Sequence, residues 1–191
     1  IPGKGEFDSV IEYSSPASVT YQNKNYALDR VEGAGTKISA DASQNIVRVH
    51  YSLDEKSTDP KDPEKPDEVP DKYQRKVSYE AINGTVDIAY TYVTLFKDGK
   101  WNENGTGYLV DAQIASATAS QGYSAGDPLW SPKTPATDIA ISSDMHFVAT
   151  FIKGEYDYTI EYVFDGVVDT DRTIPGKGEF DSVIEYSSPA S

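Results

Sequence analysis

The chain lacks cysteine, has one methionine, and contains no apolar run near the ~20 residues that a membrane-spanning helix needs. Without cysteine there are no disulfides, so packing alone must stabilise the fold. Only 17 basic residues stand against 31 acidic ones, giving a net charge of −14. Nucleic acids and anionic membrane surfaces both require a basic footprint. We therefore expect no nucleic acid partner and no membrane insertion.

What the chain does have favours sheets. Its 191 residues are 38% apolar and 12% aromatic, enough for the cores of two small domains. Most of the aromatic residues are tyrosines, threonine and valine are plentiful, and leucine is scarce, a usage typical of half-buried pleated strands. The composition predicts a mostly β protein.

The most informative feature is an internal repeat. The first eighteen residues, IPGKGEFDSVIEYSSPAS, return unchanged as residues 174–191, at a spacing of 173 residues. Such a fixed long period is typical of tandem arrays of modules. We therefore expect this chain to be one full repeat plus an overlap, taken from a longer array, with its ends inside a module.

Composition and repeat together predict four segments. They are the C-terminal part of a first module (1–53), a linker (54–72), a second β module (73–154) and the N-terminal part of the next copy of the first module (155–191). The linker carries Pro60, Pro63, Pro66 and Pro70 among charges of both signs. Such a segment is expected to be a polyproline II spacer of about 3.1 Å per residue, roughly 60 Å in all, or else a disordered charged loop.

Alternating apolar residues predict strands in both modules. The expected strands cover residues 45–51, 86–96, 145–151 and 156–164, with hairpin turns at Asn83-Gly84 and Asp165-Gly166. A short helix capped by Asp111 is expected to begin the stretch 111–119.

Two sets of motifs resemble known families. The series YTIEYVFDG, DRTIPGKGEFDSVIEY, YALDRV and ISADASQNIVRVHY resembles the mucin-binding-protein (MucBP) type repeat of Gram-positive surface proteins. The series VSYEAINGT, VTLFKDGK and ISSDMHFVATF is similar to repeats related to the internalin B-repeat, which lie in LPXTG-anchored proteins. Together they cover nearly all of the chain outside the linker.

Both resemblances imply β-grasp (ubiquitin-like) modules, in which a small mixed sheet carries a short helix or loop across one face. In the first module the helix would be reduced to residues 180–186. The fold class expected is thus mostly β (α+β), with two such modules joined by the linker. The resemblances also imply an extracellular location on a bacterial cell wall.

No residue pattern points to catalysis, a metal or a cofactor. His50 and His146 lie on the polar faces of expected strands, without a partner at catalytic spacing. Pro2-Gly3-Lys4-Gly5 lacks the spacing of a phosphate-binding loop and is expected to be a turn. Asp165, Asp169 and Asp171 do not follow the order of a calcium loop and are expected to serve turns. We expect a protein that is not an enzyme and holds neither metal nor cofactor.

Three aromatic residues are candidates for contacts with glycans. Trp101, Tyr123 and Trp130 would stack on sugar rings if exposed, and the alternative is that they fill a small core. The function expected is a non-enzymatic repeat unit of a surface stalk or adhesive array, with host mucin, another glycan or an extracellular protein as partner. The alternative is a lectin-like module that itself binds mucin glycans.

The duplicated stretch raises a question of assembly. The first module needs residues 155–173, one copy of the eighteen residues and residues 19–51, yet the chain carries two copies. Residues 155–191 would either close back on residues 19–51 of their own chain or associate head to tail with those of another molecule.

Overall fold

The computed structural model describes residues 3–186 and is mostly β, as the composition predicts. The chain divides into two compact units. The first comprises Ile1–Ser78, Ile88–Ile114 and Ala136–His146, and the second comprises Tyr79–Asp87, Ala115–Pro135 and Phe147–Ser191. The strands are β1 (Ser18–Tyr21), β2 (Lys24–Glu32), β3 (Arg48–Leu53), β4 (Gln74–Ile82), β5 (Gly84–Val86), β6 (Tyr90–Thr94), β7 (Phe96–Lys97), β8 (Lys100–Trp101), β9 (Ala117–Ala119), β10 (Tyr123–Ser131), β11 (Met145–Lys153), β12 (Glu155–Phe164) and β13 (Val167–Glu179).

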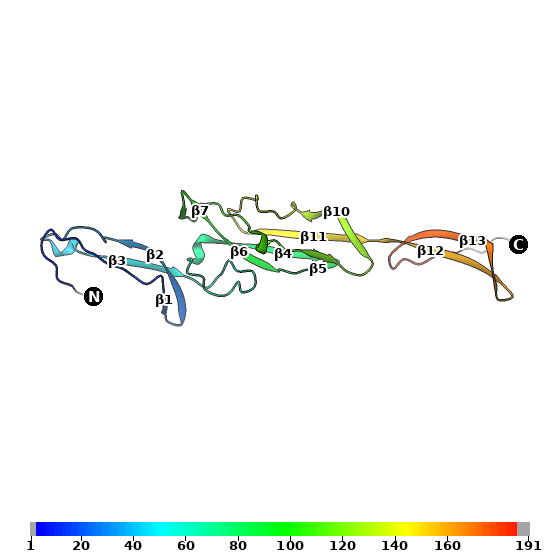
Figure 1. Ribbon diagram of the computed structural model, residues 1–191, viewed down its shortest axis with the longest axis horizontal. Helices are drawn as coiled ribbons and strands as arrows, with labels where there is room; N and C mark the ends of the chain where they lie inside the picture. Colours follow the sequence, from blue (N-terminus) through cyan, green and yellow to red (C-terminus); the bar gives the residue numbers. More distant parts are fainter. Residues whose placement is uncertain (1–2, 187–191) are drawn as a thin grey trace. The chain divides into compact units, whose positions relative to one another are not determined.

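The first unit begins with a three-stranded antiparallel sheet in the order β1-β2-β3 (Figure 1). The strand expected at 45–51 is confirmed as β3, although it starts later because residues 42–44 form a short 3-10 helix, η1 (Ala42–Gln44). The Asp41 carboxylate caps η1 by accepting a hydrogen bond from the Ser43 amide. Ala27 on β2 is fully buried.

A four-stranded sheet has the order β10-β11-β4-β6. The single strand expected over 86–96 is wrong, because this stretch forms three short strands with different partners. β5 pairs with β9, whereas β6 pairs with β4. The bend between them is fixed at Asp87, whose amide donates to the carbonyl of Ser116 while its carboxylate accepts from the Ser116 amide.

The second unit ends in the long hairpin of β12 and β13 (Figure 1). Both residues of the Asp165-Gly166 turn have positive φ, at 49° and 83°, which confirms the expected tight hairpin turn. The turn expected at Pro2-Gly3-Lys4-Gly5 is not seen among its described residues 3–5, and the same sequence in the second copy is a strand. Residues 174–179 belong to β13, because they pair with the first residues of β12.

Neither expected helix forms. Residues 111–113 make only a 3-10 turn, η3 (Asp111–Gln113), and the stretch then becomes β9, whose residues satisfy their backbone groups by pairing with β5. Residues 180–186 contain a turn at Phe180 and Asp181 followed by non-helical chain. The helices among residues 3–186 are thus short 3-10 turns, and none has the length and apolar character required to cross a membrane.

The extended spacer expected over residues 54–72 is wrong, because this segment folds into a hydrogen-bonded loop. Asp54 is fully buried, and its carboxylate accepts hydrogen bonds from the amides of Asp67 and Glu68, at 3.1 and 3.0 Å. The Ser57 amide donates to the carbonyl of Pro63, and the segment ends in the 3-10 helix η2 (Asp71–Tyr73). Prolines favour turns as well as extended chain, and aspartates accept from the backbone within turns. The charged, proline-rich composition therefore builds a compact loop.

Each unit has its own core. In the first unit the fully buried large apolar side chains include those of Val77, Leu95, Leu109 and Ile141. In the second unit Tyr79 stacks on Phe147 at 5.6 Å between ring centroids, and Trp130 meets Tyr79 edge-on at 6.2 Å. Aromatic pairs of this kind stabilise a core beyond the area that they bury.

Candidate functional site

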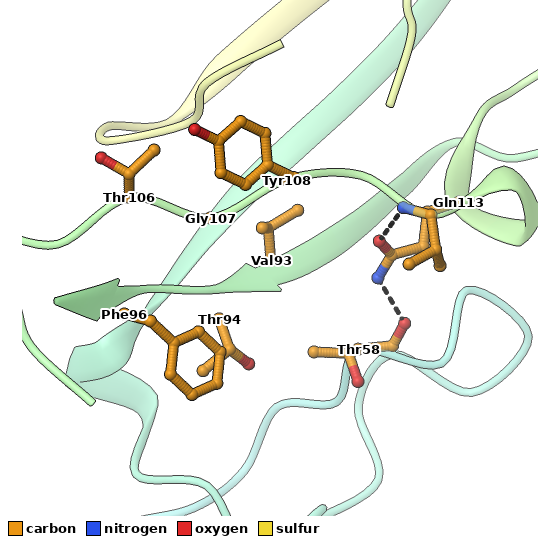
Figure 2. Close-up of a pocket in the computed structure, with 9 residues that line it drawn as sticks. Thr58, Val93, Thr94, Phe96, Thr106, Gly107, Tyr108 and Gln113 are labelled. Carbon is orange, nitrogen blue, oxygen red and sulfur yellow. Dashed lines mark hydrogen bonds between the residues drawn. The ribbon is translucent and has the colours of Figure 1, made fainter. Parts of the chain in front are cut away.

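A groove in the first unit has a volume of about 570 Å³ (Figure 2). Its lining residues are Thr58, Val93, Thr94, Phe96, Thr106, Gly107, Tyr108, Val110 and Gln113. None of these nine carries an acidic or basic side chain. The groove can therefore offer apolar contacts and hydroxyl groups to a ligand, but no carboxylate, imidazole or amine for acid–base chemistry.

Gln113 fixes the floor of this groove. Its Nε2 donates to the carbonyl oxygens of Thr58 and Tyr92, at 2.8 and 2.9 Å, and its Oε1 accepts from the Val110 amide at 3.1 Å. Figure 2 shows two of these bonds. The side chain is only 4% exposed, so it acts as a structural tie between η3, β6 and the loop 54–72.

A smaller groove, of about 380 Å³, is richer in aromatic residues and also belongs to the first unit. Its lining residues are Asp29, Tyr73, Phe96, Gly99, Lys100 and Trp101. The rings of Tyr73 and Trp101 lie 6.0 Å apart at an interplanar angle of 33°. We call this group the aromatic groove. Aromatic faces beside charged groups can stack on a sugar ring while polar groups bond its hydroxyls.

Asp29 lies at the base of the aromatic groove, with its side chain only 3% exposed. Its carboxylate accepts hydrogen bonds from Lys72 Nζ at 2.8 Å, from Tyr73 Oη at 2.6 Å and from Arg30 Nη1 at 3.0 Å. Burial raises the pKa of Asp29, but the hydrogen bonds from Lys72 and Tyr73 outweigh it and hold the pKa below its usual value. The carboxylate is therefore ionised and fully engaged at neutral pH.

The three aromatic candidates from the sequence lie in different environments. Trp101 is half-buried on β8 and lines the aromatic groove, so its contact with a glycan stays a prediction. Tyr123 lies at the start of β10, with its ring 5.8 Å from that of Phe180. Trp130 is only 7% exposed and packs on Tyr79, so its position supports the alternative, a core residue.

The two histidines lie on β3 and β11, as expected. His50 Nε2 is 3.3 Å from Glu32 Oε2, and His146 Nδ1 is 2.9 Å from the hydroxyl of Ser78. The Ser78–His146 pair lines neither of the two grooves. A nucleophile and its base require a concave site that holds the substrate against them, and these two grooves do not provide one.

Three aspartates of the loop 54–72 have a structural role. Asp67 and Asp71 each accept hydrogen bonds from backbone amides of the loop 54–72, as Asp54 does. Burial raises the pKa of Asp54 and of Asp67. Within residues 3–186, no group of three or more aspartate, glutamate or histidine residues is arranged to hold a metal ion.

Several groove residues were not foreseen from the sequence. Asp29 and Tyr73 are separated by 44 residues, and no local pattern joins them. The sequence pattern predicts Phe96 within a long strand and gives no sign that its side chain, 47% exposed, lines both grooves. The sequence signal that could have indicated the place is the KDGK turn, because such turns hold their flanking residues at the surface.

The comparisons with known proteins add no relative. No protein-family model, curated protein or solved structure matches this chain.

Proposed function

We propose that this chain is a non-enzymatic repeat unit of a long bacterial surface protein, in which tandem modules form a stalk or adhesive array outside the cell wall. The observation that carries the proposal is the duplication of eighteen residues at a spacing of 173. Many copies of a weakly binding module raise overall affinity through effective concentration, and a long stalk carries a distal site away from the cell.

Two structural features support a load-carrying role. The loop 54–72 is tied by the buried Asp54, and Asp29 of β2 is bonded to Lys72 and Tyr73 immediately before β4. Within the first unit, these bonds join the three-stranded sheet to the following chain by more than a single flexible backbone. The net charge of −14 opposes collapse of neighbouring repeats onto each other.

A β-grasp arrangement belongs to the same proposal. The strands available for such a module are those of the β12–β13 hairpin and the β1-β2-β3 sheet of a following repeat. Mixed strand order and a short connection across one face would identify it in a solved structure of two repeats.

The stalk is tested with chains of one, two and four repeats, each joined through a single copy of the duplicated stretch. Small-angle scattering should give a maximum dimension that grows by a constant increment with each repeat. A dimension that levels off between two and four repeats would contradict a stalk.

The second candidate is direct binding of mucin glycans, which the aromatic groove favours. Trp101, Tyr73 and Phe96 offer ring surface there, beside Lys100. The 191-residue chain should then bind on a glycan array, and Trp101→Ala should abolish the signal. The matched control is Tyr21→Ala, because Tyr21 is an exposed aromatic residue outside the groove. Equal binding by both variants would reject the groove as a glycan site.

A further inference from the structure

The two identical copies of the duplicated stretch share one local structure. In the first copy, Ser9 donates from its amide and its hydroxyl to the carbonyl of Glu6, at 3.1 and 2.6 Å. In the second copy, Ser182 makes the same two bonds to Glu179, at 3.1 and 2.7 Å. The intervening aspartates, Asp8 and Asp181, have positive φ of 68° and 61°. This turn is therefore set by the local sequence, whatever surrounds it.

Before the turn, the second copy has a strand partner, and the described part of the first copy has none. Its residues 174–179 pair with the first residues of β12, and the Phe180 amide donates to the carbonyl of Gly154 at 2.8 Å. The Phe180 ring lies 5.8 Å from that of Tyr123 and 6.2 Å from that of Tyr156. In the first copy, residues 3–6 form no strand, and the equivalent Phe7 is 74% exposed.

After the turn, only the first copy has a strand partner. Val10 forms an antiparallel bridge with Lys37, flanked by bonds from the Ile38 amide to the Ser9 carbonyl and from the Ile11 amide to the Thr36 carbonyl. In the second copy, residues 183–186 belong to no strand or bridge. Val183, the counterpart of Val10, is 84% exposed.

The two sets of contacts use different backbone groups. Those of the second copy come from residues 174–179 and the amide of Phe180. Those of the first copy begin at the amide of Asp8, which is one position further along the duplicated stretch. A single copy can therefore make both sets at once without competition for a donor or an acceptor.

The surroundings of the two glycines in the PGKG sequence also differ between the copies. A Cβ on Gly5 would lie 2.0 Å from Ile38 Cδ1, whereas its counterpart Gly178 has no neighbour closer than 3.2 Å. A Cβ on Gly176 would lie 2.3 Å from the Tyr158 ring, whereas its counterpart Gly3 has no neighbour within 4 Å. In each copy, only one of the two glycines lies where an added Cβ would come within 3.0 Å of a neighbour. Glycine at both positions therefore suits a single stretch that lies against Tyr158 on one side and Ile38 on the other.

Apolar side chains remain exposed on both partial structures. On the hairpin of β12 and β13 they are Tyr156, Val163, Phe164, Val167, Val168 and Ile174, each between 40 and 70% exposed. In residues 3–53 they are Phe7, Val10, Tyr13, Tyr21 and Ile46, between 42 and 74% exposed. A two-stranded hairpin is marginal alone, and exposed apolar patches mark interaction surfaces.

We propose that residues 155–186 of one repeat and residues 19–53 of the following repeat fold into one module around a single copy of the duplicated stretch. The occupant of the exposed hairpin is thus the β1-β2-β3 sheet of a second copy of this chain. The shared stretch pairs with β12 before its turn and with residues 36–38 of the next repeat after it. This proposal rests on the tandem arrangement of the proposed function.

The test uses a two-repeat chain, consisting of residues 1–173 followed by residues 1–191, so that the central copy serves both repeats. The bonds that flank Val10 and Lys37 make them a non-hydrogen-bonded pair, whose Cα atoms lie about 4.5 Å apart, within disulfide range. The natural chain has no cysteine to interfere. Val10→Cys and Lys37→Cys are placed in the second segment, and Asp157→Cys of the first segment is combined with Lys4→Cys of the second, the counterpart of Lys177, to report the β12–β13 pairing.

Under oxidised glutathione, both disulfides should form within the same two-repeat molecule, as read by peptide mapping. Replacing the Lys37→Cys change by Thr36→Cys moves the thiol to the opposite face of the strand, and the first disulfide should then be lost. Molecules that hold either disulfide but never both would overturn the proposal. The stalk could still lengthen with each repeat in that case, so the two failures are distinguishable.

Glycine variants give a second test without cysteines. In the 191-residue chain, Gly176→Ala should lower the thermal midpoint by about 4 °C or more, and Gly178→Ala should leave it unchanged. In the two-repeat chain, both changes in the central copy should lower it. A Gly176→Ala change that lowers the midpoint of the 191-residue chain but is silent in the central copy of the two-repeat chain would overturn the proposal, because the shared stretch would then not lie against the Tyr158 ring.

Discussion

The hydroxyl of Tyr73 lies 2.6 Å from Oδ1 of Asp29, although 44 residues separate the two in the chain. The same carboxylate accepts from Lys72, so it ties the end of the loop 54–72 to β2. A carboxylate this buried depends on its donors, because an ionised group without them would be strongly disfavoured.

Asp29→Asn should therefore destabilise the first unit by about 2 kcal/mol, because the amide cannot accept all three bonds and the Lys72 ammonium loses its counter-charge. Urea unfolding followed by tryptophan fluorescence measures the change, since Trp101 lines the same groove. The matched control is Asp138→Asn at an exposed position, which should shift stability by less than about 0.5 kcal/mol. Equal effects of the two changes would contradict the role given to Asp29.

The ionised Asp29 carboxylate also predicts that the stability of the fold depends on pH. Its folded pKa is lowered, chiefly by the bonds from Lys72 and Tyr73 acting against burial, so its contribution is complete above the unfolded pKa near 4. That contribution is lost as the pH falls through the folded pKa. Tyr73→Phe removes one of the bonds, so the stability difference between natural chain and variant should shrink between pH 6 and pH 3.

The pKa of Asp54 is shifted in the opposite direction, so its effect on stability with pH has the opposite sign. Burial raises its folded pKa, so its protonation favours the fold as the pH falls from the folded pKa towards 4. Comparing the natural chain with Tyr73→Phe cancels this term, because Asp54 is present in both. A difference that stays constant from pH 6 to pH 3 would show that Tyr73 does not act through the ionised Asp29.

The compact loop 54–72 should resist proteolysis. Trypsin can cut after Lys56 and Lys61, and an extended spacer would be cut at both within minutes. The hydrogen bonds that the amides of Asp67 and Glu68 donate to Asp54 should instead keep cleavage slow in the natural chain.

Asp54→Ala removes both acceptors and should speed this cleavage at least about tenfold, as a loss of 1.4 kcal/mol in local stability implies. Glu68→Gln changes an exposed side chain of the same loop and serves as the control. Rapid cutting of the natural chain would restore the interpretation of a flexible linker.

Phe7 and Phe180 occupy the same position in the two copies of the duplicated stretch but have different surroundings. Phe180→Ala should destabilise the second unit by about 1–2 kcal/mol, because its ring contacts Tyr123 and Tyr156. Phe7→Ala should change stability by less than about 0.5 kcal/mol at low protein concentration, since Phe7 is 74% exposed. Circular dichroism during heating measures both, and equal effects would mean that the two copies are equivalent.

Head-to-tail association of residues 155–191 with residues 19–51 of another molecule also stays a prediction. Light scattering on the 191-residue chain should show a mean mass that rises with concentration without a fixed end point, as expected of an open heterologous contact. Val183→Lys should suppress the rise, because the counterpart of Val183 pairs with Lys37 and the change would place a like charge directly opposite it. A monomeric mass at every concentration would contradict the association.

Local patterns predicted the local structure well. The mostly β composition, β3, β11, β12 and the Asp165-Gly166 turn follow from alternation and from the turn preferences of single residues. The errors lie where distant partners decide. Residues 86–96 split because β5 pairs with β9, and the proline-rich loop folds because Asp54 reaches amides thirteen and fourteen residues away.

The candidate site was harder to foresee for the same reason. Trp101 was named from its type, but its neighbours Asp29 and Tyr73 come from segments that the sequence does not link. Trp101 and Trp130 differ in role because Trp130 is buried and Trp101 is only half-buried. Burial depends on the packing of the whole sheet, which the local sequence does not indicate. Tertiary contacts of this range exceed what periodicity can indicate.

The division of contacts at the duplicated stretch also has a consequence for how the number of repeats can change during evolution. If one copy joins every pair of neighbouring repeats, an unequal genetic crossover inside the identical stretch adds or removes whole units while each junction keeps the same contacts. Lineages could then lengthen or shorten the protein without a new interface to optimise. Only the first and last units would need special partners, because each would present half of a junction to the solvent.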